Sequence, residues 1–171
     1  AYDMRYQITY QSDVPRFWGW TPGEFLLASS RMGDMKGWQK DWKSLSKSGI
    51  VDPEWIQVYE SVHTTAGAFY TTTNGLITQS LLSNLVSDWF GKLEIAKCNP
   101  WKGQVVLKNI SLLTGIRVDG VINGNNSVID LTAWKDCEFE LYGETINMKE
   151  NETLSLKLNT GTKKILSMQN K

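Results

Sequence analysis

The chain has 171 residues, 41% of them hydrophobic, and its 18 Lys and Arg residues balance its 18 Asp and Glu residues. A neutral chain lacks the overall positive field that nucleic acid attracts, so we expect no nucleic-acid partner and only local electrostatic recognition. The sequence has no apolar run near the roughly 18 residues of a membrane span and no visible signal peptide, which predicts no membrane span and leaves the localisation open.

Groups that carry chemistry are scarce. His63 is the one histidine, Cys98 and Cys137 are the two cysteines, and eight tryptophans stand beside them. No phosphate loop, dinucleotide turn or metal-ligand cluster occurs, so we expect no cofactor, no metal and no catalytic residues. The two cysteines fit reduced, buried thiols better than a disulfide, which is the alternative.

The N-terminal segment alternates in polarity. Tyr2, Met4, Tyr6, Ile8 and Tyr10 share one face, and this period predicts a half-buried strand over residues 2–10.

An aromatic run then precedes the first expected helix. Three large rings within four residues place a large apolar surface in a predicted turn, where its exposure to water is unfavourable. Arg and Trp are also frequent interface anchors. We predict an interface with another chain here, with core packing as the alternative. The residues are Arg16, Phe17, Trp18 and Trp20.

Two helices are expected next. Thr21, Pro22 and Glu24 form a capping box with proline at the first helical position, which starts a helix that ends at Gly33. Asp34 can cap a second helix running to about Ser48. Its apolar stripe is predicted to be buried, and consists of Met35, Trp38, Trp42 and Leu45. The opposite stripe is predicted to be exposed, either as a solvated face or as a contact for an acidic partner, and consists of Lys36, Lys40, Lys43 and Lys47.

The middle of the chain is less regular. Residues 52–62 fit either a helix or a strand, and Asn74-Gly75 predicts a turn. A third helical face follows between Leu81 and Trp89, with Gly91 as its stop.

From residue 92 the pattern is that of β-strands. Six short apolar runs separated by turn residues predict an antiparallel meander or sandwich over residues 92–168. Asp136, Glu138 and Glu140 fall on one face of a strand, where Glu138 and Glu140 offer an acidic contact surface for the lysine stripe.

These elements predict a single domain, 1–171, of the α+β class and mainly β. An N-terminal strand and helical portion, 1–91, packs on a C-terminal antiparallel β-sandwich, 92–168. The segment 123–164 places a short strand and polar turn, from Ile129-Asp130 to Glu144-Thr145-Ile146-Asn147, before a Leu-rich strand and Gly turn, Leu154 to Thr162. In this it resembles the β-sandwich domains of phage tail and baseplate structural proteins.

That resemblance implies a structural subunit of a virion and carries over no site residue. We therefore expect a non-enzymatic assembly component whose partners are copies of itself or other structural subunits. One alternative is a carbohydrate-binding or adhesion module, which would hold a glycan on exposed Trp and Tyr side chains. The other is a small hydrolase that uses paired carboxylates or His63.

Overall fold

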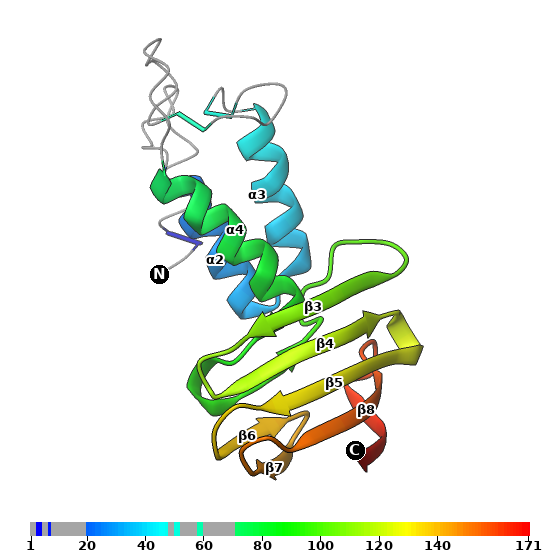
Figure 1. Ribbon diagram of the computed structural model, residues 1–171. Helices are drawn as coiled ribbons and strands as arrows, with labels where there is room; N and C mark the ends of the chain where they lie inside the picture. The colour runs from blue at the N-terminus through cyan, green and yellow to red at the C-terminus, as the bar shows by residue number, and fades with distance from the viewer. Residues whose placement is uncertain (1–2, 5–6, 8–19, 48–49, 52–57, 60–70) are drawn as a thin grey trace. The chain divides into compact units, whose positions relative to one another are not determined.

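The computed structural model describes residues 3–4, 7, 20–47, 50–51, 58–59 and 71–171. It divides into two compact units, residues 1–83 and 84–171. The described part contains three helices of 13 residues or more and nine strands, and every named sheet is antiparallel (Figure 1). The predicted α+β, mainly β class is confirmed. That the units act as one domain stays a prediction.

The N-terminal unit contains α2 (Trp20–Met32), α3 (Met35–Lys47) and most of α4 (Thr71–Leu85). Gly33, with φ of 72°, ends α2: its N–H donates to the carbonyl of Ser30, and Asp34 N–H donates to the carbonyl of Ser29. This is a glycine-terminated helix end, in which two carbonyls of the last turn are paired. Asp34 Oδ1 then accepts the N–H of Gly37 at 2.9 Å and caps α3. The predicted break and cap are both confirmed.

The predicted apolar stripe of α3 is buried at two of its four positions and half-buried at Met35 and Trp42. Trp38 and Leu45 are buried, and Trp42 is half-buried and stacks on Trp38 with ring centroids 5.0 Å apart. The same helix also buries Asp41, whose carboxylate accepts a hydrogen bond from the hydroxyl of Ser29 on α2 at 3.0 Å. The helical periodicity did not predict a buried polar residue at this position, because the hydroxyl that bonds Asp41 belongs to another helix.

Helices α2 and α4 approach closely. A Cβ on Gly23 would lie 2.7 Å from the Cβ of Leu76, so this crossing needs glycine. Seven residues on, the Ser30 hydroxyl donates to the carbonyl of Ser80 at 3.1 Å. Small side chains therefore allow these two helices to pack backbone to backbone.

Three predictions for the N-terminal half are wrong where the structure can be compared. Of residues 2–10, the structure describes Asp3, Met4 and Gln7, and all three are helical; the i, i+4 spacing of the tyrosines fits a helix as well as a strand. The predicted Asn74-Gly75 turn lies inside α4. Burial of Ile77 and Ser80 on that helix outweighs the local turn preference.

The third helix also ends earlier than predicted. It stops at Leu85, and Val86–Ser87 forms β1, which pairs with β2 (Glu94–Ile95). Strand pairing of the β-branched Val86 interrupts the predicted helix, and Trp89–Gly91 forms a separate 3-10 turn. In the ambiguous segment 52–62, Val58 forms an antiparallel bridge with Val51; residues 52–57 and 60–62 lie outside the described residues.

The C-terminal unit is built on a five-stranded antiparallel sheet (Figure 1). In spatial order its strands are β3 (Val105–Ser111), β4 (Ile116–Ile122), β5 (Ser127–Ala133), β8 (Thr153–Asn159) and β9 (Lys164–Asn170). A hairpin of β6 (Cys137–Leu141) and β7 (Glu144–Met148) and the β1-β2 pair form two smaller sheets.

One apolar core joins these sheets. Ile129, Leu131 and Leu156 alternate along the large sheet and pack in the same cluster as Leu93 of the loop before β2 and Phe139 of β6. The predicted strands at 105–110, 116–122, 128–131, 139–142 and 154–158 are confirmed within a residue or two. In the described part of the chain, none of the helices is long and apolar enough to cross a membrane.

Candidate functional site

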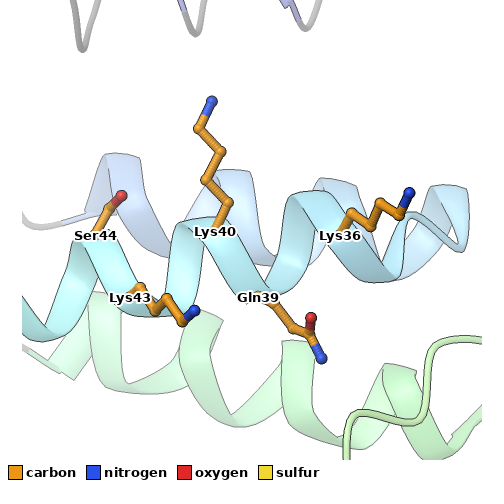
Figure 2. A pocket seen from close by; sticks show the side chains of 5 residues that line it. All are labelled: Lys36, Gln39, Lys40, Lys43 and Ser44. Carbon is orange, nitrogen blue, oxygen red and sulfur yellow. The ribbon is translucent and has the colours of Figure 1, made fainter.

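The lysines of α3 form the first candidate surface. Lys36, Lys40 and Lys43 are exposed as predicted, and the side chain of Lys47 lies outside the described residues. Together with Gln39 and Ser44, the three described lysines line an open pocket of about 400 Å³ (Figure 2). The helix thus gathers three positive charges along one hollow, which suits a partner with carboxylates. That it contacts such a partner stays a prediction.

The predicted aromatic interface can be located only in part. Arg16, Phe17 and Trp18 lie outside the described residues. Trp20 is the first residue of α2 and is exposed. Its role in an interface stays a prediction.

The predicted acidic face lies on β6 and the residue before it, and two of its three carboxylates are ion-paired. Glu140 contacts Lys92 at 3.4 Å, and Asp136 contacts Lys149 at 2.7 Å. The hydrogen bond from Lys149 and the backbone N–H of Glu150 hold the pKa of Asp136 below its ordinary value. A general acid needs the opposite shift. Glu138 is exposed and has no ion-pair partner among the described residues.

A shallow pocket of about 330 Å³ lies beside this face. Its lining is Asp136, Cys137, Glu138, Asn147, Met148 and Lys149. Burial raises the pKa of the Cys137 thiol, which makes it a poorer nucleophile at neutral pH. These side chains suit contact with a partner better than covalent chemistry.

A third, smaller pocket of about 160 Å³ is lined in part by ion-paired side chains. It lies where β2 approaches the β6-β7 hairpin, and Tyr142 forms part of its wall. The Tyr142 hydroxyl donates to the carbonyl of Ile95 at 2.9 Å, and burial, aided by the charge of Glu94, raises the pKa of Tyr142 to about 12. Glu94 itself pairs with Lys97 at 2.7 Å. The phenol is therefore a structural hydrogen-bond donor and not a neutral-pH base.

Sequence reasoning missed an exposed apolar surface of the C-terminal unit. Three loops meet at one end of the large sheet, namely residues 88–91, 112–115 and 134–136. Asp88 Oδ2 accepts the N–H of Thr114 at 2.7 Å, and Trp134 N–H donates to the carbonyl of Gly115 at 2.9 Å. These bonds hold the loops together, and each loop carries one exposed apolar side chain.

We call these three side chains, Phe90, Leu113 and Trp134, the loop-end surface; they are 99%, 83% and 52% exposed. Phe90 also has φ of 55°, a left-handed conformation that is costly for a bulky residue. Strain and full exposure in one aromatic residue together make Phe90 a candidate binding position. The signal in the sequence is a large apolar residue within turn chemistry, as in Trp89-Phe90-Gly91.

Two exposed tryptophans of the C-terminal unit follow different strands. Trp101 follows β2 and Trp134 follows β5, and the ammonium of Lys135 lies 5.1 Å from the ring centroid of Trp134. Within the described ranges, no group of three or more His, Cys, Asp and Glu side chains is arranged to hold a metal ion. His63 lies outside the described residues, and the glycan and hydrolase alternatives stay predictions.

The chain matches no protein-family model and no curated protein.

Proposed function

We propose that this chain is a non-enzymatic structural or assembly component, of the kind that builds virions, and that it acts through contacts between subunits. The observation that carries the proposal is the loop-end surface, where Phe90 is fully exposed in a strained backbone conformation. Exposed aromatic anchors on rigid loops contribute most of the energy in many protein interfaces. Exposure to solvent alone provides no interaction that would offset the cost of this backbone strain.

The polar chemistry of the C-terminal unit supports the same proposal. Asp136 is paired with Lys149, Glu140 is paired with Lys92, and Tyr142 is bonded to a backbone carbonyl. Groups used in this way position the hairpin and keep it rigid. Rigid loops lose little conformational entropy when they bind, which favours a contact surface.

The test replaces Phe90 with glycine. Glycine accepts the left-handed backbone, and the phenyl ring makes few contacts within the subunit, so the free energy of unfolding should stay equal or rise by up to about 1 kcal/mol. Assembly should weaken at the same time, because the ring is lost from the interface. Particle mass by analytical ultracentrifugation and melting by circular dichroism measure the two effects separately.

Val106→Thr is the matched control. Val106 is an exposed residue at the far end of β3 from these loops, and threonine keeps its shape and its strand preference. It should leave the particle mass unchanged. A parent protein that stays monomeric at every concentration, or a Phe90→Gly protein that assembles as strongly as the parent, would refute the proposal.

A further inference from the structure

The two edges of the five-stranded sheet are protected differently. At one edge, β3 carries Lys108 in its middle and a bulge at Asn109, which has φ of 56° and donates its N–H to the carboxylate of Asp119 at 2.8 Å. A charge and a bulge are the usual devices that stop an edge strand from pairing with another chain.

The other edge, β9, has β8 as its one strand neighbour among the described residues. From Ile165 to Asn170 it contains no charged residue and no proline. A register shift in its pairing lies near Leu166, so the stretch from Ser167 to Asn170 is regular. Leu166 and Met168 on this strand are 54% and 41% exposed. Past this register shift, the stretch from Ser167 to Asn170 has neither a charge nor a bulge, so it is the open part of the β9 edge.

The direction of the backbone groups follows from one hydrogen bond. Lys171 N–H donates to the carbonyl of Thr153 on β8 at 2.9 Å. Because backbone groups alternate along an antiparallel strand, the amides of Ser167 and Gln169 also point toward β8. Met168 and Asn170 therefore present both N–H and C=O to the outside of the sheet.

We propose that β9 pairs with β9 of a second copy of this chain, antiparallel and across a two-fold axis. An antiparallel pair of identical strands forms each hydrogen bond twice, and it brings the exposed Met168 side chain near its counterpart. No like charges from residues 165–170 meet across the axis, because that stretch has none. The pairing joins two sheets into one of ten strands.

The paired stretch is short, so the surface area that it buries is below the roughly 1,200 Å² of a stable standard interface. The pairing is therefore weak and depends on concentration, so that it acts in an assembly held by further contacts. It does not rest on the loop-end surface: Phe90→Gly should leave it intact.

Amide hydrogen exchange of the unmodified full chain, followed by NMR, tests the pairing. The outward amides of Met168 and Asn170 should exchange at least about tenfold more slowly in concentrated than in dilute solution, while Ser167 and Gln169 are slow in both. Fast exchange of Met168 and Asn170 at every concentration overturns the proposal. Slow exchange in a dilute, monomeric sample also overturns it, because the chain's own residues would then cover the edge.

A pair of variants separates backbone pairing from side-chain contact. Met168→Pro removes an outward N–H and no bond to β8, whereas Met168→Thr removes the same apolar side chain and keeps the N–H. Proline should weaken dimer formation at least about tenfold, and threonine by less. Equal loss in both folded variants overturns the edge pairing. If the proline variant does not fold, the exchange measurement on the parent decides.

Discussion

A single phenol links the β6-β7 hairpin to β2. Tyr142 donates to the carbonyl of Ile95, and its pKa is raised to about 12 by burial. An unfolded tyrosine ionises near pH 10, so the stabilisation is fully present below pH 10 and is lost as the pH rises toward 12. We predict that the unfolding free energy of the parent falls over this range. In Tyr142→Phe this step should be absent.

At neutral pH the same substitution should cost about 1 kcal/mol, because the carbonyl of Ile95 loses its donor. Urea unfolding at pH 8 and pH 11 measures the free energies, and tyrosinate absorbance follows the titration. If the parent and Tyr142→Phe lose stability in parallel above pH 10, Tyr142 is not the group responsible. If the late-titrating phenol persists in the variant, its assignment is wrong.

At the scale of the helix, Asp34 and Gly37 act as a unit. Asp34 caps α3 through the N–H of Gly37, and a Cβ on residue 37 would lie 2.3 Å from Asp34 Oδ2. Gly37→Ala alone therefore gains about 1 kcal/mol of helix propensity and loses about as much cap, for a net change near zero. In an Asp34→Ala background, where no cap remains, Gly37→Ala should stabilise by about 1 kcal/mol.

Thermal unfolding of the parent, the two single variants and the double variant gives this coupling energy directly. The control is Gln39→Ala, an exposed site on α3, the helix of Gly37. Ser29→Ala would be a poor control because Ser29 bonds Asp41. Gln39→Ala should show no coupling to Asp34. Additive effects of Asp34→Ala and Gly37→Ala contradict the arrangement of this cap.

Some elements could be predicted from their own residues, and others depend on contacts with distant parts of the chain. Gly33 and Asp34 specify the α2-α3 boundary through bonds that span a few residues, and strands β5 and β8 alternate in sequence as they do in the sheet. Both were therefore predictable. The strand β9 was not predictable, because its residues do not alternate between buried and exposed positions. It forms a strand because its backbone pairs with β8.

The candidate surfaces also differ in whether the local sequence predicts them. The lysines of α3 share a helix face by their spacing alone, so their gathering along one pocket could be expected. The loop-end surface brings together residues from three separate loops and is held by bonds between them. No local pattern encodes that meeting, and the burial of Asp41 against Ser29 has the same non-local origin.

At the scale of the whole molecule, a neutral chain carries two local patches of opposite charge, the lysines of α3 and the exposed glutamates of the β6-β7 hairpin. Lys36 and Lys40 belong to the first unit, and Glu138 and Glu144 are exposed in the second. A head-to-tail contact between copies would pair these surfaces. We predict that Lys36→Glu with Lys40→Glu in one variant, and Glu138→Lys with Glu144→Lys in another, each weakens assembly without loss of fold.

An equal mixture of the two reversed variants is the decisive sample, because it restores opposite charges across one contact. Its particle mass should exceed that of either variant alone, and raising the salt concentration should reduce the parent's mass. Salt leaves the loop-end surface and the β9 edge largely unaffected, since those contacts are apolar or use backbone bonds. A mixture no heavier than its components, together with a parent insensitive to salt, would leave assembly to those two surfaces and remove the charge pairing.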